Sequence, residues 1–205
     1  AAALEPENPA IWKNRSEALA DGNRLDDALE SCEKILGFEP ANTDAWIRKG
    51  GILIRQERYD DAIAALNKAL ELDAGNAAAW AKKGEALSAR GSAEDALEAF
   101  DHALDIDNGL EEVWKQKGTA LLRTGSNREA AAAFGHALSL DPHDSDAWAG
   151  KGIALCNLGR YSEAVGALDT GLSARPEDTG LLIRKGRALY ALGRNADAAG
   201  IFDRA

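Results

Sequence analysis

The sequence predicts an all-α solenoid, in which antiparallel helix pairs stack in a row instead of surrounding a single core. All five tryptophans lie 34 residues apart, at Trp12, Trp46, Trp80, Trp114 and Trp148. A sixth place at the same interval holds Leu182. A fixed interval of about 20–50 residues is the signature of a repeat protein. Within each interval the apolar residues recur at gaps of three and four, which is the periodicity of an amphipathic helix.

The repeat boundaries follow when tryptophan is numbered as the fourth residue of each repeat. The chain then divides into the tail of a preceding repeat at 1–8, repeats at 9–42, 43–76, 77–110, 111–144 and 145–178, and a truncated sixth repeat at 179–205. The chain contains no methionine, and its two ends fall at equivalent phases of the repeat. We therefore expect a piece of a longer array.

The first half of each repeat is expected to form a helix with one apolar stripe. In repeat 43–76 this stripe contains Trp46, Lys49, Gly50 and Leu53. Glycine occupies position 8 in five repeats, and Ser16 occupies it in the first. A glycine inside a helix costs about 1 kcal/mol relative to alanine, so its recurrence indicates a close approach between the paired helices.

A short turn and a second helix complete each repeat. Position 15 is glycine in four repeats, at Gly91, Gly125, Gly159 and Gly193. Glycine there allows the left-handed backbone that ends a helix. Acidic residues follow, as at Asp60 and Asp61, where they complement the dipole of the second helix. Alanine fills position 20 throughout, and the second helix is expected to end before Pro40, Pro142 and Pro176.

These residues resemble the tetratricopeptide repeat family over essentially the whole chain. The shared pattern is Trp at position 4, Gly at 8, Leu at 11, Gly at 15, Ala at 20, an aromatic residue or Leu at 24, Ala at 27 and Pro at 32. The resemblance implies a right-handed superhelical solenoid whose first helices line a concave groove. Position 7 departs from the family, because it is Arg15 in the first repeat and lysine in the others. The resulting Trp-x-x-Lys-Gly-x-Ala-Leu pattern resembles archaeal-type arrays.

The basic residues at position 7 have a structural interpretation. We expect each stem to pack along a neighbouring helix while its charged end reaches water.

The same resemblance implies that positions 2, 5, 6, 9, 12 and 13 face a ligand. The peptide-binding residues expected from it are Lys13, Arg48, Ile54, Arg55, Lys82, Lys115, Leu122, Arg123, Asn157, Arg184, Arg187 and Tyr190. These positions carry eight basic and six acidic side chains, whereas the whole chain has 24 basic and 34 acidic residues. An acidic or C-terminal-carboxylate peptide is therefore one expected ligand, and an ordinary solvated helix face is the alternative.

Some family members grip a terminal carboxylate with a two-carboxylate clamp. That clamp needs asparagine four residues after a lysine of the first helix, but Glu17 follows Lys13 and Thr119 follows Lys115. No register of the sequence satisfies the clamp, so we do not expect recognition of that kind.

Composition and charge exclude several other classes of function. The net charge of −10 argues against binding to nucleic acids and to anionic membranes. No apolar run reaches the roughly 18 residues of a membrane span. Two cysteines, Cys32 and Cys156, are too few for a disulfide framework, so we expect a reducing compartment and a cytoplasmic location.

Catalytic and metal sites are not expected. His102 and His136 share position 26 one repeat apart, which is too far for one zinc ion, and we expect surface histidines. Cys32 occupies a core position, whereas Cys156 faces the groove without a base to activate it. The sequence therefore predicts no catalytic residues, no metal and no cofactor.

The predicted function is that of a non-catalytic interaction scaffold, which binds a protein or peptide in its groove. Two alternatives stay open. Copies of the chain could associate end to end, or the chain could be the regulatory arm of an enzyme whose catalytic part lies outside it.

Overall fold

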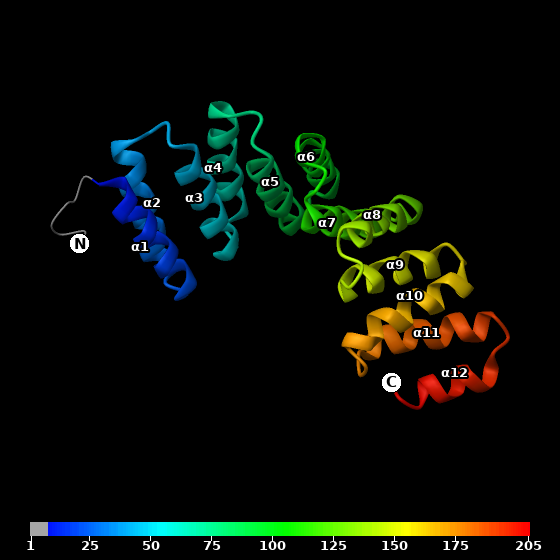
Figure 1. Ribbon diagram of the computed structural model, residues 1–205. Helices are drawn as coiled ribbons and strands as arrows, with labels where there is room; N and C mark the ends of the chain where they lie inside the picture. Colours follow the sequence, from blue (N-terminus) through cyan, green and yellow to red (C-terminus); the bar gives the residue numbers. More distant parts are fainter. Residues whose placement is uncertain (1–7) are drawn as a thin grey trace. The chain divides into compact units, whose positions relative to one another are not determined.

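The computed structural model describes residues 8–205, which form twelve α-helices and no strand (Figure 1). The first helices of the six pairs are α1 (Pro9–Asp21), α3 (Thr43–Arg55), α5 (Ala77–Arg90), α7 (Glu111–Arg123), α9 (Ser145–Asn157) and α11 (Thr179–Ala191). The second helices are α2 (Leu25–Phe38), α4 (Tyr59–Leu72), α6 (Ala93–Ile106), α8 (Asn127–Leu140), α10 (Tyr161–Ala174) and α12 (Asn195–Phe202).

The prediction of an all-α solenoid of helix pairs is confirmed. Each first helix begins at the first residue of a repeat as numbered from the sequence. The repeat boundaries themselves stay a prediction, and most of the expected tail at 1–8 lies outside the described residues.

The chain divides into two units, Ala1–Asp107 and Asn108–Ala205. Within the first unit, α1 to α6 pack in chain order, and α3 also contacts α5. Within the second, α7 to α12 pack in the same way, and α9 contacts both α7 and α11. The contacts between successive first helices give each unit a face made of first helices only. Burial is local in both units, because each helix is covered by its neighbours along the chain.

The tightest contact inside each pair lies between positions 8 and 24. A Cβ atom on Gly84 would lie 2.5 Å from the ring of Phe100, and one on Gly50 would lie 2.6 Å from Leu66. In the first pair the Ser16 hydroxyl lies 3.1 Å from the Cys32 sulfur. The close approach predicted from the recurring glycines is therefore present, and it leaves no room for a larger side chain at position 8.

All six turns within the pairs place position 15 in the left-handed region of the backbone. The four glycines there have φ between 74° and 98°. Asn23, with φ 58°, and Glu57, with φ 59°, adopt the same conformation without being glycine. Asparagine tolerates this region better than most residues, whereas glutamate has a β-carbon that crowds the backbone there.

The tryptophans attach each repeat to the loop that precedes it. Four of the indole N–H groups donate to the carbonyl oxygen six residues earlier at 2.9–3.0 Å, in the pairs Trp46–Pro40, Trp80–Ala74, Trp114–Asn108 and Trp148–Pro142. The hydrogen bond explains why a residue with a polar ring atom recurs at a half-buried position.

The basic residue at position 7 lies over the tryptophan of its own helix. The distance from the charged group to the ring centroid is 4.9–5.6 Å in all five repeats that contain tryptophan. This is a cation–π contact. The charged ends of Arg15 and Lys49 also contact Ser31 and Glu33 on the neighbouring helix α2, so the contact with a neighbouring helix that the sequence predicted accompanies the cation–π contact.

Side-chain caps begin most first helices. The Asn42 side chain accepts a hydrogen bond from the Ala45 amide at 2.9 Å, and Asn76, Asp144 and Asp178 act in the same way. The exception is α7, where Leu110 stands at the cap position and offers no side-chain acceptor. The uncapped helix is the one that begins the second unit.

We predict that Glu57→Gly stabilises the protein by about 0.5–1 kcal/mol, because it removes the steric strain of a left-handed glutamate. Chemical denaturation should show a higher midpoint at an unchanged slope. The matched control is Gly91→Ala at the same repeat position, which should lower the midpoint. A lower denaturation midpoint for Glu57→Gly would show that the left-handed backbone at Glu57 carries no steric strain.

We predict opposite effects for two glycine-to-alanine substitutions. Gly84→Ala should destabilise the protein by about 1–3 kcal/mol, because the new methyl group overlaps the Phe100 ring. Gly135→Ala, on the open side of α8 with no atom within 4 Å of its Cβ, should stabilise it by about 0.5–1 kcal/mol. Urea unfolding of both variants measures the difference, and equal effects would overturn the packing account.

Candidate functional site

The candidate site is the first-helix face, which we define as positions 2, 5, 6, 9, 12 and 13 of the first helices. These positions project from α1, α3 and α5 in the first unit and from α7, α9 and α11 in the second. Each unit has an open pocket whose lining comes mainly from this face.

The pocket of the first unit, the α3 pocket, has a volume of about 520 Å³. Its lining consists of Ala20, Asp44, Ile47, Arg48, Gly51, Ile52, Arg55, Asn76, Ala78 and Lys82. Isoleucine and glycine on α3 make the middle of the pocket apolar, while charged side chains stand around it. Apolar surface with a few polar groups is typical of ligand sites.

The basic side chains of the first unit's face already have partners on the same face. Lys13 lies 4.0 Å from Asp44, and Arg48 lies 4.0 Å from Glu17. Arg55 donates a hydrogen bond to the Asn23 side chain, at 3.3 Å. These contacts are exposed and weak. They nevertheless offset the positive charge that the sequence assigned to this part of the groove.

The pocket of the second unit, the α9 pocket, has a volume of about 390 Å³. Its lining consists of Lys115, Thr119, Leu122, Phe134, Asp146, Ala149, Gly150, Ile153, Arg175, Asp178, Gly180, Leu181 and Arg184. Gly150 is essential to its shape, because a Cβ atom there would meet the Phe134 ring. The absent side chain lets the ring of a second-helix residue reach the first-helix face.

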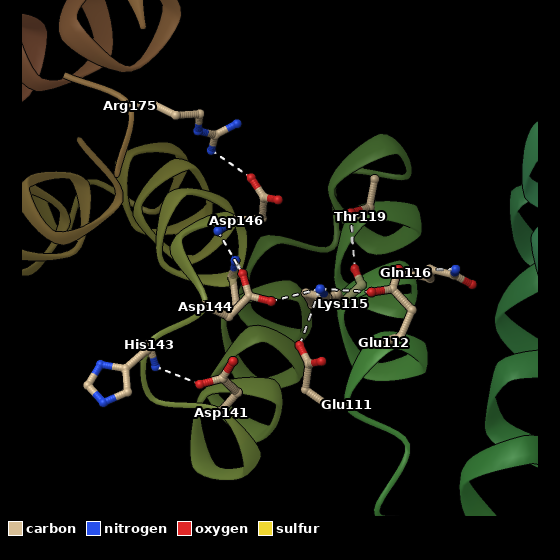
Figure 2. Close-up of polar contacts among 11 residues, drawn as sticks. Glu111, Glu112, Lys115, Gln116, Thr119, Asp141, His143, Asp144, Asp146 and Arg175 are labelled. Carbon is tan, nitrogen blue, oxygen red and sulfur yellow. Dashed lines mark hydrogen bonds and ion pairs between the residues drawn. The ribbon is translucent and has the colours of Figure 1, made fainter. Parts of the chain in front are cut away.

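Lys115 lies at the centre of a carboxylate cluster beside the α9 pocket, as Figure 2 shows. Its ammonium group lies 2.7 Å from Asp144, 2.7 Å from Glu112 and 3.3 Å from Glu111. Asp144 is also the cap of α9, and it accepts hydrogen bonds from the amides of Asp146 and Ala147. Lys115 therefore ties α7 to the beginning of α9 and is not available to a ligand.

The pKa values in this cluster follow from burial and hydrogen bonding together. Burial alone would lower the pKa of Lys115, but its hydrogen bonds to Asp144 and Glu112 outweigh that effect and raise it. Burial alone would raise the pKa of Asp144, but hydrogen bonds from Lys115 and from the Ala147 amide lower it to about 2. Burial and the hydrogen bond to Asp144 raise the pKa of Glu111. Glu111 is therefore the acid of the cluster whose ionised form is disfavoured in the folded protein.

Arg175 is the second basic residue of the α9 pocket with acidic partners. Its guanidinium lies 2.8 Å from Asp146, as drawn in Figure 2, and 3.9 Å from Asp178. Arg184 projects into the same pocket from α11 and is exposed. Within residues 8–205 no acidic group lies within ion-pair distance of Arg184.

The structure distributes the predicted site residues over both units. Those that line the α3 pocket are Arg48, Arg55 and Lys82, and those that line the α9 pocket are Lys115, Leu122 and Arg184. Lys13 borders a smaller hollow of about 170 Å³ between α1 and α3. Ile54 packs against a buried cluster that includes Leu53. The remaining predicted residues, which lie on first helices and line neither pocket, are Arg123, Asn157, Arg187 and Tyr190.

Sequence reasoning missed four contributors to the α9 pocket, namely Phe134, Arg175, Asp178 and Leu181. Phe134 comes from a second helix, and Arg175 comes from the end of α10. The available signal for Phe134 was Gly150, a glycine at position 6 where the other repeats carry asparagine, glutamine, lysine or arginine. No comparable signal pointed to Arg175.

His102 and His136 lie against aromatic rings, and the two cysteines are buried or half-buried. His102 stacks on Trp80, and His136 stacks on Trp114, each with 4.4 Å between ring centroids. Cys32 is fully buried, and burial raises its pKa. Burial also raises the pKa of the half-buried Cys156, against a smaller opposite effect of Arg184. A raised pKa disfavours the reactive thiolate in both cases.

Residues 8–205 contain no group of three histidine, cysteine, aspartate or glutamate side chains placed to hold a metal ion. In the same part of the chain, every helix is too short or too polar to cross a membrane.

Comparison with known proteins identifies the repeats. Two family models described as tetratricopeptide repeat match the chain, one at residues 18–83 and 53–118 and the other at 115–179 and 151–205. Together they cover nearly all of the six helix pairs. No curated protein is similar enough in sequence to count as a relative.

Solved structures share the fold at low sequence identity. PilF of Pseudomonas aeruginosa superposes with a TM-score of 0.82 at 18% identity, over 95% of this chain and 88% of that one. YrrB, described as a TPR protein with an unusual peptide-binding site, gives 0.71 at 23% identity, over 94% and 95%. A tetratricopeptide repeat protein from Parabacteroides merdae gives 0.76 at 21% identity, over 96% and 78%.

We predict that Glu111→Gln raises the melting temperature at pH 7 by about 2 °C. The raised pKa means that the folded protein binds the Glu111 proton more tightly than the unfolded chain does. Stability from this group is thus present at low pH and is lost as the pH rises through the folded pKa. A glutamine stays neutral and avoids the loss, so the advantage should shrink toward pH 4.

Melting curves of the parent and the variant between pH 4 and pH 8 provide the measurement. Glu112→Gln, which removes an exposed partner of the same lysine, is the control and should change the melting temperature little. A Glu111→Gln variant that is less stable than the parent at pH 7 would show that the folded protein does not disfavour the ionised form of Glu111.

Proposed function

Because the chain belongs to the tetratricopeptide repeat family, we propose that it is a non-catalytic protein-interaction scaffold whose first-helix face holds a segment of a partner protein. One observation carries this proposal. The α3 pocket and the α9 pocket both lie on the first-helix face, and their linings combine apolar side chains with charged ones; a further open pocket, of about 330 Å³, is lined mainly by α2, α3 and α4. Over residues 8–205, the second helices supply more of the buried apolar side chains than the first helices do.

The dimensions of the pockets support a peptide segment as the ligand. Volumes of about 390 and 520 Å³ are in the range of known ligand sites, and both pockets are open to solvent. An extended segment can place single side chains in such pockets while its backbone crosses the helices. The described peptide-binding site of YrrB, a protein with the same fold, supports this choice of ligand.

The two pockets differ in what they offer to a peptide. In the α3 pocket, an acidic ligand would have to displace Asp44 from Lys13, Glu17 from Arg48 and Glu85 from Lys82. Binding there rests instead on apolar contact with Ile47 and on close approach to the backbone at Gly51. The preference for acidic peptides expected from the sequence is therefore weaker in the α3 pocket, where Arg55 alone of the three lining cations has a neutral partner, Asn23.

We predict that substitutions on the first-helix face weaken binding and that substitutions on the second helices do not. Peptides of 12 residues with blocked ends would first be selected from a display library against the parent protein. Their dissociation constants would then be measured by fluorescence anisotropy. Each selected peptide should lose about tenfold or more in affinity with one of two variants, Arg55→Glu or Leu122→Asp, according to which pocket it occupies.

The matched controls are Lys34→Glu on α2 and Arg128→Glu on α8, which are exposed positions of second helices. They should change affinity less than about twofold, because they alter net charge as much as Arg55→Glu does without touching either pocket. Equal weakening by controls and face variants would show that net charge alone drives capture. A library that yields no binding peptide would contradict the proposed function.

A further inference from the structure

Arg184 is the unpaired charge of the α9 pocket. The other charged residues of the lining are engaged, because Lys115 lies 2.7 Å from Asp144, and Arg175 lies 2.8 Å from Asp146 and 3.9 Å from Asp178. Arg184 is exposed, and within residues 8–205 it has no ion pair and no hydrogen bond to an acid. Its positive charge is therefore available to a ligand.

Comparison of the repeats shows why Arg184 is unpaired. Arg184 is at position 6, as is Arg48 in the first unit. Arg48 pairs with Glu17, which stands at position 9 of the preceding repeat. The residue at position 9 before Arg184 is Ile153, which packs against a buried apolar cluster. Arg184 therefore occupies a position at which Arg48 is ion-paired, but Ile153 stands where the acidic partner would be.

An apolar floor lies next to this arginine. Leu122, Ile153 and Leu181 line the α9 pocket, and the Phe134 ring reaches it beside Gly150. The volume of about 390 Å³ exceeds what one aliphatic or aromatic side chain fills, so the pocket also has room for the backbone that carries it. The pocket thus combines one apolar site with one cation.

We propose that the α9 pocket binds an internal segment of a partner protein in which an apolar side chain lies on this floor and a nearby aspartate or glutamate pairs with Arg184. This inference rests on the function proposed above and specifies its ligand in the second unit. A carboxylate is the complementary group, because it accepts two parallel hydrogen bonds from a guanidinium.

An internal segment fits better than a chain end. The two-carboxylate clamp of some family members uses several cations and amides around one terminus, whereas this pocket supplies a single unpaired cation. The pocket is also open, so that a chain can enter and leave it. Arg187, one helical turn further along α11, adds a second exposed cation outside the pocket and favours acidic residues on that side of the segment.

The test uses peptides with an acetylated N-terminus and an amidated C-terminus, so that no terminal charge contributes. Each peptide carries one leucine and one glutamate, separated by one to four residues of alanine, serine and glycine. Fluorescence anisotropy would measure their affinity for the whole chain. The best peptide should bind about tenfold more tightly than its glutamate-to-glutamine analogue, as expected for a charge-assisted hydrogen bond.

Two pairs of variants locate the effect. Arg184→Glu should weaken the best peptide about tenfold, whereas Arg48→Glu, at the same repeat position in the first unit, should leave its affinity within about twofold. Ile153→Glu restores the missing acid beside Arg184 and should abolish the advantage of glutamate over glutamine in the peptide. Ile153→Gln has the same shape without the charge and should keep most of that advantage.

The outcomes separate this inference from the proposed function. Peptides that bind through the first-helix face with equal affinity for glutamate and glutamine would overturn the inference and leave the scaffold function intact. A free C-terminal carboxylate that binds more tightly than the internal glutamate would also overturn it. No binding by any of these peptides, together with an unproductive library selection, would contradict both.

Discussion

The whole array depends on how closely two paired helices approach at position 8. Glycine or serine at that place lets the residue at position 24 pack against the first helix, as Gly84 and Phe100 show at 2.5 Å from a hypothetical Cβ. Repetition of this contact sets the same distance in each pair. Successive pairs can therefore pack on one another with like geometry, and burial stays local. The constraint acts on one side of the first helix only, which leaves the opposite side free to vary.

Divided roles for the two helices follow from that constraint. The second helix presents positions 20, 24 and 27 to the core, so alanine and large apolar residues dominate it. The first helix uses tryptophan and the basic residue at position 7 as a local pair, in which the indole binds the preceding loop and also covers the charge. The histidine stacked on Trp80 belongs to the same local cluster. With these contacts satisfied, positions 5, 6 and 9 can carry different side chains in each repeat, and binding specificity can reside there.

The fold could be predicted from the sequence because each of its determinants recurs. Tryptophan, the glycine of position 8 and the turn of position 15 all appear at one interval, so an error in one repeat is corrected by the others. The departures from the pattern were harder to interpret. Glu57 takes a left-handed backbone that its residue type does not indicate, and Leu110 leaves α7 without a side-chain cap. The candidate site was only partly predictable. Family positions identified Arg184 and Leu122, but which cations are paired depends on neighbours 16 to 31 residues away, as for Lys115 and Asp144.

Ion pairs between adjacent repeats are the feature that turns a uniform array into a selective one. On the first-helix face a basic residue at position 6 can be neutralised by an acid at position 9 of the repeat before, as Glu17 neutralises Arg48. A face with all such pairs complete has little net attraction for a charged partner, because a ligand must replace an existing contact to gain a new one. A single incomplete pair changes this balance at one place. Ile153 creates that place beside Arg184, and Gly150 leaves space for the buried Phe134 ring, which contributes to the apolar floor next to it. Two departures from the repeat pattern, Gly150 and Ile153, therefore give the α9 pocket both a hydrophobic and an ionic point of attachment.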